Sequence, residues 1–304
     1  MIEILVISGK GGTGKTSLTA AFAQLARNHV LCDLDVDAPD LHLLLAPRRI
    51  ETHEFYSGHQ AIVREQDCTG CGQCPDWCQF EAIALCDDQA PAMVDPLKCE
   101  GCKVCVSMCP ADAIDFPERH CGHWYVSDTR FGPMVHAQLF PGDENSGRLV
   151  ALLRKTARDL AEANGLGLIV SDGPPGIGCP VISSLSGTSL VVIVTEPTLS
   201  GTHDLKRVAE LCAHFRIPAG VVINKYDINT DESQQIETHC QDHGLVFFGK
   251  VPHDVAMTDA MVNGQAITEY QTDGLADDIR AVWNNIRDHA ETATRTQAAG
   301  EADG

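Results

Sequence analysis

Eight cysteines of the chain fall into two runs with the same internal spacing. The runs are Cys68-x2-Cys71-x2-Cys74-x3-Cys78 and Cys99-x2-Cys102-x2-Cys105-x3-Cys109, the second followed by Pro110. Cysteine thiolates at this spacing bind [4Fe–4S] clusters. Zinc also takes four thiolates, but zinc sites rarely place four cysteines in one run and then repeat it. Two iron–sulfur clusters are therefore the favoured interpretation.

The repeat is an internal duplication, and it resembles bacterial ferredoxins that carry two clusters. Residues 68–83 align with residues 99–114 without a gap, although Gln79 stands where the second run has Pro110. In such ferredoxins the fourth cysteine of each run binds the other cluster. The resemblance therefore assigns one cluster to Cys68, Cys71, Cys74 and Cys109, and the other to Cys99, Cys102, Cys105 and Cys78. So small a unit buries little core, and two clusters are expected to serve as its covalent centre.

A second pattern, Gly9-x4-Gly14-Lys15-Thr16, matches the P-loop. An apolar segment precedes it and a helical segment follows, which is the context that the motif requires. Its glycines let backbone N–H groups turn toward nucleotide phosphates, while Lys15 reaches the β- and γ-phosphates and Thr16 binds Mg²⁺. The residues expected to contact ATP here are Gly9, Gly11, Gly12, Thr13, Gly14, Lys15, Thr16 and Ser17.

The segment from Lys10 to Thr16, Lys-Gly-Gly-x-Gly-Lys-Thr, resembles the deviant P-loop of the MinD/ParA/Mrp group of ATPases. The resemblance covers roughly residues 1–290. It implies that Lys10 reaches across a dimer to the ATP of the other subunit. It also implies that Lys10, Lys15 and Asp35 are the catalytic residues, with Asp35 positioning the attacking water.

The same resemblance implies the remaining ligands of the nucleotide site. Asp33 ends an apolar segment and is expected to help hold Mg²⁺, although neighbouring acids leave the assignment among them open. Asp172, in Asp-Gly-Pro-Pro-Gly, is expected to bind Mg²⁺ through water. Asn224 and Pro252 are expected to contact the adenine base.

Alternating apolar runs and helical stretches predict an α/β protein with a mostly parallel, doubly wound P-loop sheet and an inserted small α+β ferredoxin-like domain. The expected strands are 2–7, 30–33, 125–127, 134–137, 166–172, 190–195, 219–224 and 245–251. The expected helices are 15–28, 147–163, 203–215, 232–243 and 275–289. The ATPase domain is predicted over 1–61 and 118–289, the two-cluster insert over 62–117 and a disordered tail over 290–304.

The composition restricts the partners. With 22 Lys plus Arg against 42 Asp plus Glu, the formal net charge of −20 disfavours binding to nucleic acid and to anionic membranes. The apolar start of the chain contains an acid and resembles a first strand, not a signal peptide. We therefore expect a cytoplasmic protein. The family resemblance implies a homodimer, or a heterodimer with a related ATPase, and the two clusters imply a redox partner protein.

The two motifs together predict an ATP-binding and ATP-hydrolysing protein with two [4Fe–4S] clusters and Mg²⁺. Since the insert follows the segment expected to respond to the γ-phosphate, we hypothesise that the nucleotide state gates electron transfer to the partner. One alternative is an iron–sulfur cluster scaffold or carrier of the Mrp type. A second is a positioning ATPase like MinD or ParA.

Other cysteines and histidines carry weaker expectations. Cys32, Cys212 and Cys240 are expected to be buried inert thiols, and packing is favoured for Cys86 and Cys121. Near the expected dimer axis, a small hydrophobic role is favoured for the Cys179 thiol over a bridge between two copies. The sequence His120-Cys121-Gly122-His123 invites a metal interpretation, but no further residue at zinc-ligand spacing supports it.

Overall fold

The computed structural model describes residues 1–85, 87, 90–143 and 147–302, with side chains described up to residue 293. The chain divides into two units. The larger consists of Met1–His53, Trp124–Gln138 and Asn145–Gly304, and the smaller of Glu54–His123 and Leu139–Glu144. The smaller unit begins before residue 62 and ends after residue 117, so it is wider than the predicted insert.

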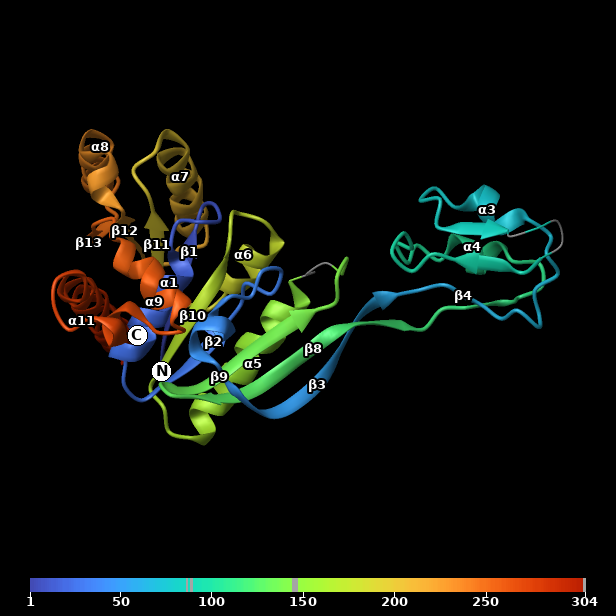
Figure 1. The fold of residues 1–304 in the computed structure, drawn as a ribbon, viewed down its shortest axis with the longest axis horizontal. Coiled ribbons are helices and arrows are strands. Elements are labelled where there is room, and N and C mark those ends of the chain that lie inside the picture. The colour runs from blue at the N-terminus through green and yellow to red at the C-terminus, as the bar shows by residue number, and fades with distance from the viewer. Residues whose placement is uncertain (86, 88–89, 144–146, 303–304) are drawn as a thin grey trace. The chain divides into compact units, whose positions relative to one another are not determined.

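A nine-stranded sheet has the strand order β13-β12-β11-β1-β10-β2-β9-β8-β3 (Figure 1). Its strands are β1 (Ile2–Ser8), β2 (His29–Asp33), β3 (Arg48–His59), β8 (Glu118–Thr129), β9 (Gly132–Leu139), β10 (Leu168–Pro175), β11 (Leu190–Thr195), β12 (Ala219–Asn224) and β13 (Val246–Val251). Every neighbouring pair from β13 to β9 is parallel. The predicted α/β class with a mostly parallel sheet is confirmed.

The central strands are buried on both faces because helices cover each side. Ile4 and Val6 join a core with α1, α10 and α11, and Leu5 and Ile7, which point the other way, are also fully buried. The helices of the larger unit are α1 (Lys15–Leu25), α2 (Leu41–Leu45), α5 (Arg148–Ala163), α6 (Cys179–Leu185), α7 (Leu199–His214), α8 (Thr230–Asp242), α9 (Val255–Val262), α10 (Ile267–Tyr270), α11 (Leu275–Ala302) and the 3₁₀ helix η1 (Tyr226–Ile228).

The smaller unit contains two short antiparallel sheets and two one-turn helices. Its elements, besides the ends of β3, β8 and β9, are β4 (Ile62–Val63) paired with β7 (Ile114–Asp115), β5 (Ile83–Leu85) paired with β6 (Ala92–Val94), α3 (Gln73–Trp77) and α4 (Val104–Met108). Its buried core consists of Ala61, Ile83, Ala92, Cys105 and Ile114. Cysteine side chains pack directly against this small core, so sulfur forms much of its interior.

Several elements differ from the sequence predictions. α1 ends at Leu25 and not at Asn28, since Ala26 is already extended and Asn28 has a positive φ of 52°. β3 was missed, because most of its residues are exposed and polar and show no apolar run.

The predicted disordered tail is wrong where it can be examined. α11 continues to Ala302, well beyond the expected end at His289, and residues 303–304 lie outside the described residues. Disorder was predicted for residues 290–304 because few of their side chains are large and apolar. Five of the fifteen residues 290–304 are nevertheless alanine and none is proline, which favours a helix.

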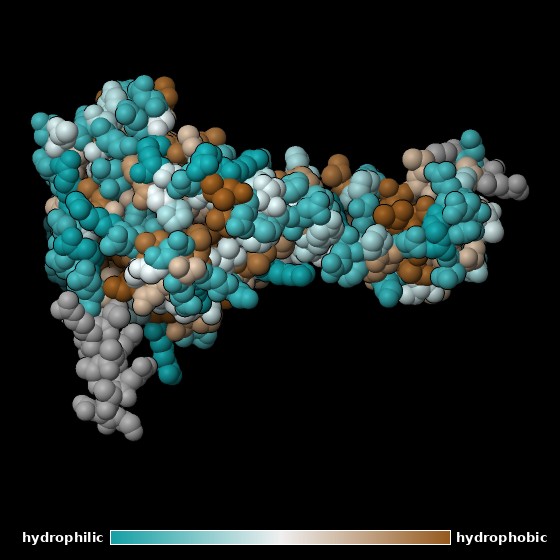
Figure 2. Space-filling model, turned by 90° about the horizontal axis from the view of Figure 1, so that it is seen from below, coloured by the Kyte–Doolittle hydropathy of each residue, from teal (hydrophilic) through white to brown (hydrophobic). Residues whose placement is uncertain are grey.

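The face of the molecule drawn in Figure 2 is mostly hydrophilic. Teal side chains predominate on the face drawn in Figure 2, in keeping with the charge of −20. Among the described residues, no helix combines the length and apolarity needed to cross a membrane.

Candidate functional site

The loop between β1 and α1 requires glycine at two positions. A Cβ on Gly9 would lie 2.3 Å from Cβ of Asp204, a backbone-anchored atom that cannot swing away. A Cβ on Gly14 would lie 2.3 Å from Nδ2 of Asn224, and Gly14 has a φ of 85°, which disfavours any other residue. The loop therefore packs closely against α7 on one side and the end of β12 on the other.

Lys15 lies at the centre of a buried group of charges. Its Nζ is 3.0 Å from Oδ2 of Asp172 and 3.4 Å from Oδ2 of Asp35. Burial alone would lower the pKa of Lys15, but the facing carboxylates, Asp172 first, outweigh it and raise the pKa. Lys15 is therefore held as a cation, the form that binds phosphate.

Asp33 and Asp35 crowd the same space from the end of β2. Burial, followed by the neighbouring Asp172 carboxylate, raises the pKa of Asp33 well above its ordinary value. Burial also raises the pKa of Asp35 to about 6, although the Lys15 cation opposes it. Three carboxyl groups thus face a single ammonium group, and a bound cation would favour their ionised forms.

The residues present fit Mg²⁺. Oδ2 of Asp33 is buried and has no hydrogen-bond partner within the described part of the chain. The Thr16 hydroxyl donates to Oδ2 of Asp172 at 2.7 Å, and the Thr19 hydroxyl approaches Oδ1 of Asp172 at 2.9 Å. A hydroxyl and carboxylates are the oxygen ligands and water-holding groups that Mg²⁺ requires. The contact of Thr19 with Asp172 was missed from the sequence, since only the fold brings α1 beside the end of β10.

Lys10 does not point into this group of acids. Its Nζ is 2.6 Å from Oε1 of Glu196 and 3.0 Å from Oγ of Ser200. Lys225 approaches the other oxygen of Glu196 at 3.5 Å. Burial opposes ionisation of Glu196, but the hydrogen bond from Lys10 and the two lysine charges lower its pKa. Glu196 was not predicted, although its place directly after an apolar strand was a usable signal.

Asn224 and Pro252, expected at the adenine base, and Ser17, expected in the ATP-binding loop, make different contacts. Nδ2 of Asn224 donates to the Thr13 carbonyl at 2.8 Å, so Asn224 links the loop to the end of β12. Ser17 points elsewhere, with Oγ 3.2 Å from Sδ of Met261 on α9. Pro252 lies just after β13 and is half-buried, and the next residue, His253, donates its backbone N–H to Asp227. Asn224 and Ser17 therefore act through protein contacts in this structure.

One hollow in the smaller unit gathers the first predicted set of cysteines. Its lining includes Cys68, Cys71, Cys74 and Cys109, with Ile114 from β7 at its base. Burial, with smaller contributions from the neighbouring Cys68 and Cys71 thiols, raises the pKa of Cys74 to about 11. The fourth cysteine of the second run thus lies with the first three of the first run.

The second set shows the reciprocal arrangement. Burial raises the pKa of Cys105, and the thiols close enough to raise it further are Cys99, Cys102 and Cys78. Two backbone N–H groups donate to sulfur in equivalent positions, Ala82 to Cys78 and Ala113 to Cys109, each at 3.3 Å. Such donors stabilise cluster-bound thiolates and tune the potential of a cluster. The donor sets fit two four-cysteine clusters, and none of the described cysteines forms a disulfide.

The remaining cysteines are mostly buried. Cys32, Cys212 and Cys240 are fully enclosed, as expected, and burial raises the pKa of each thiol. Cys121 is buried and donates to the Ser57 carbonyl at 3.2 Å, so it packs as favoured. By contrast, Cys179 at the start of α6 is exposed. Cys86 lies outside the described residues.

The parallel sheet, the loop and the buried lysine define a P-loop nucleotide-binding protein. The model of the CobQ/CobB/MinD/ParA nucleotide binding domain matches residues 4–267. The chain belongs to this family.

Two similar proteins come from Methanocaldococcus jannaschii. The uncharacterized protein MJ0578 is 35% identical over 232 residues, which cover 75% of this chain and 80% of the relative. The uncharacterized protein MJ0579 is 26% identical over 283 residues, covering 89% of this chain and 93% of the relative. Both alignments extend over most of the two chains.

Solved structures share the fold. The septum site-determining protein MinD of Pyrococcus horikoshii, complexed with Mg-ADP, superposes with a TM-score of 0.60 at 16% identity, covering 96% of this chain and 98% of its own. The complex of Cyanothece McdA(D38A) with ATP gives 0.54 at 14% identity, covering 94% and 96%. At such low identity these likenesses concern the fold alone.

Proposed function

We propose that this protein binds and hydrolyses Mg·ATP and carries two [4Fe–4S] clusters that pass electrons to a partner protein, in a manner that depends on the bound nucleotide. The observation that carries the proposal is the grouping of eight cysteines into two sets of four on a chain whose P-loop lysine faces Asp172 at 3.0 Å.

The proposal that the protein hydrolyses ATP rests on the charged side chains around Lys15. ATP brings phosphates to Lys15, whose ammonium then exchanges its contact with Asp172 for the β- and γ-oxygens. The Asp172 carboxylate and the Thr16 hydroxyl are left to hold the metal, which neutralises phosphate charge. Asp35, with its pKa raised to about 6, is ionised at neutral pH and accepts a hydrogen bond from the attacking water.

We propose a dimer in which Lys10 completes the site of the other subunit. In the single chain Lys10 is 32% exposed and is held by Glu196. An exposed ion pair of this kind contributes about 0–1 kcal/mol, so releasing Lys10 costs little. The dimer would then assemble only when a triphosphate offers Lys10 a stronger partner.

The proposal that the protein carries two clusters rests on the two sets of four cysteines and on the backbone N–H groups that donate to their sulfur atoms. When bound, each cluster supplies reversible one-electron transfer at low potential. Exposed apolar side chains lie next to the fourth cysteines, on α3 and α4. Trp77 is 46% exposed and Met108 is 45% exposed. Apolar and aromatic residues of this kind favour a protein partner at the position where electrons leave.

The coupling follows from chain connectivity. The acids of the nucleotide site are followed by α2 and then by β3, and β3 runs without interruption from the residues of the larger unit into those of the smaller. A γ-phosphate that displaces this acidic segment therefore has a covalent route to the cysteine-bearing unit.

The first experiment measures iron and electrons. Protein purified without oxygen is expected to contain about eight iron atoms per chain and, once reduced, to show two interacting cubane signals by EPR. Cys109→Ser should lose about half of the iron, whereas Cys179→Ser, which changes an exposed cysteine outside both runs, should lose none. Zinc in place of iron, or equal iron in both variants, would refute the cluster assignment.

The second experiment measures ATP. Lys15→Ala should reduce phosphate release at least about a hundredfold, whereas Lys155→Ala on the exposed face of α5 should not change it. Reduction potentials and electron transfer to a dye acceptor are then compared with ATP, with ADP and without nucleotide. Identical values in the three states would exclude gating, and rapid loss of iron to an apo-acceptor protein would favour the carrier alternative.

A further inference from the structure

Three side chains in the smaller unit converge without belonging to either cysteine set. They are Glu54 on β3 and His120 and His123 on β8. Their ligand atoms, one carboxylate oxygen and one ring nitrogen from each histidine, all lie within 4.8 Å of one another. Ligands of a tetrahedral zinc ion lie about 2.0–2.1 Å from the metal and so about 3.3 Å apart. Small side-chain rotations would therefore bring all three onto one ion.

The backbone of β8 departs from regular alternation to make this possible. Residues three apart on a regular strand point to opposite faces of the sheet. His120 and His123 nevertheless meet edge to face, with ring centroids 4.9 Å apart. Between them Cys121 and Gly122 are both buried, so burial does not alternate here as it does along a regular strand, a pattern that a β-bulge produces. Bulges of this kind redirect side chains and are common next to functional sites.

Two hydrogen bonds orient the ligand groups. The Tyr56 hydroxyl donates to Oε2 of Glu54 at 2.7 Å, which steadies an otherwise exposed carboxylate. Nε2 of His120 is 3.0 Å from the carbonyl oxygen of Gly122, an acceptor only, so Nε2 is the donor and Nδ1 is the ring nitrogen left to face a metal ion. A ligating histidine usually donates its other ring N–H to a carbonyl or carboxylate in this way.

Aromatic packing restrains the rings further. Phe140 meets both imidazoles edge to face, at centroid distances of 4.9 Å from His120 and 5.5 Å from His123. Tyr56 stacks on His120 at 5.0 Å. The same tyrosine thus orients the carboxylate through its hydroxyl and one imidazole through its ring. Both rings are half-buried, so they are restrained while access from solvent remains.

We propose that Glu54, His120 and His123 bind a divalent transition-metal ion, with zinc as the preferred ion, and leave one coordination position for water. Two neutral imidazoles and one carboxylate form a borderline donor set that suits zinc or ferrous iron and disfavours Mg²⁺ and Ca²⁺. The ion would join β3 to β8 within the smaller unit and would be independent of the sulfur ligands.

The test uses the full-length, iron-loaded protein prepared without oxygen, dialysed against buffered zinc and analysed for zinc and iron. About one zinc per chain is expected in addition to the iron. Glu54→Gln, which changes an exposed side chain, and His123→Ala should each weaken zinc binding at least about tenfold. His53→Ala, which removes another histidine of β3, should bind zinc as the parent does, and the iron content of all three should be unchanged.

X-ray absorption spectroscopy at the zinc edge identifies the atoms that bind the zinc ion. Nitrogen and oxygen neighbours at about 2.0–2.1 Å and no sulfur at about 2.3 Å are expected. A sulfur shell would place the zinc in the cysteine runs and overturn the proposal. Unchanged zinc affinity in both Glu54→Gln and His123→Ala would overturn it as well. Neither result would bear on ATP hydrolysis or on the iron content, which test the proposed function separately.

Discussion

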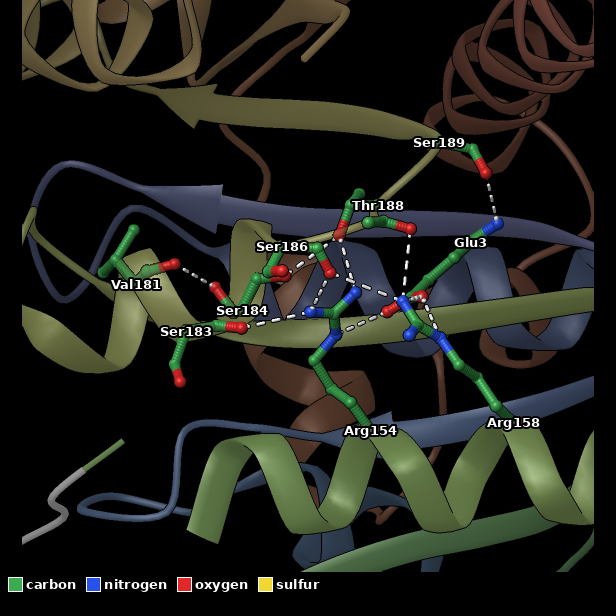
Figure 3. Close-up of polar contacts among 10 residues, drawn as sticks. Glu3, Arg154, Arg158, Val181, Ser183, Ser184, Ser186, Thr188 and Ser189 are labelled. Carbon is green, nitrogen blue, oxygen red and sulfur yellow. Dashed lines mark hydrogen bonds and ion pairs between the residues drawn. The ribbon is translucent and has the colours of Figure 1, made fainter. Parts of the chain in front are cut away.

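Replacing Arg154 on α5 by methionine tests how the C-terminal end of α6 is held to β1 and α5. Nε of Arg154 is 2.7 Å from Oε1 of Glu3, and both side chains are about 5% exposed or less. The same guanidinium donates to the carbonyl of Ser183 at 3.0 Å and to the hydroxyl of Thr188 at 3.2 Å (Figure 3). Arg158 holds the other oxygen of Glu3 at 2.7 Å but is 36% exposed.

The expected loss in the free energy of unfolding follows from the difference in burial between Arg154 and Arg158. Removing one partner of a buried ion pair costs about 3–5 kcal/mol, because the other charge stays buried; in Arg154→Met, Glu3 keeps only the half-exposed Arg158, and the Ser183 carbonyl loses its donor. Arg154→Met keeps most of the side-chain volume, so the loss reports charge and hydrogen bonds more than packing. Arg158→Met removes a half-exposed partner and leaves Arg154 in place, so it should cost only about 1 kcal/mol.

The assay is guanidinium unfolding followed by far-UV circular dichroism. At a slope of roughly 6 kcal/mol per molar for a protein of this size, the Arg154→Met midpoint should fall by about 0.5–0.8 M with an unchanged slope. Arg158→Met should shift it by no more than about 0.2 M. The variant with both substitutions should lose more unfolding free energy than the two single variants together, because Glu3 then loses both of its arginine partners.

Equal shifts for the two single variants would refute this reasoning. A loss below about 1 kcal/mol for Arg154→Met would refute it too, since it would mean that water reaches Glu3 and compensates its charge. A changed slope would show that the variant alters the folded or unfolded ensemble, in which case the midpoint no longer reports the ion pair.

Three other predictions concern the larger unit. Gly14→Ala should abolish ATP binding measured by calorimetry, because the new Cβ meets Asn224, whereas Gly167→Ala, with open space around it, should bind normally. Burial lowers the pKa of His29 to about 4, so the unfolded chain takes up a proton that the folded chain does not, and stability falls as pH drops from about 6.5 to 4. His29→Leu should flatten that dependence by up to about 3 kcal/mol in pH-dependent unfolding. Asp172→Asn should reduce Mg²⁺-dependent phosphate release at least about a hundredfold while nucleotide binding without metal persists.

Several elements were predictable because their environment is uniform. The strands 190–195 and 219–224 agree residue for residue with β11 and β12, since a strand buried on both faces needs an unbroken apolar run. The P-loop was located from its glycines and lysine, whose spacing encodes a local backbone shape. β3 escaped prediction because its stability comes from pairing in the sheet, which leaves no apolar pattern in the sequence.

Contacts between distant segments were the least predictable part of the site. Glu196, which pairs with Lys10, and Thr19, which contacts Asp172, lie on elements that meet only in the fold. Glu54 completes the group formed by the two histidines for the same reason. Local spacing cannot show such partners, because the pairing of distant segments decides which side chains face each other.

The sequence by itself determined the chemical groups: two equal cysteine runs, a phosphate-binding loop and acids that follow apolar strands. The family resemblance assigned acids to one site, but only the tertiary structure decided how they meet Lys15. Asp33 and Asp172 converge on Lys15 because β10 lies between β1 and β2. The carboxyl ends of parallel strands share one edge of a sheet, but the order of the strands depends on helix packing over both faces. That order brought the three charges together.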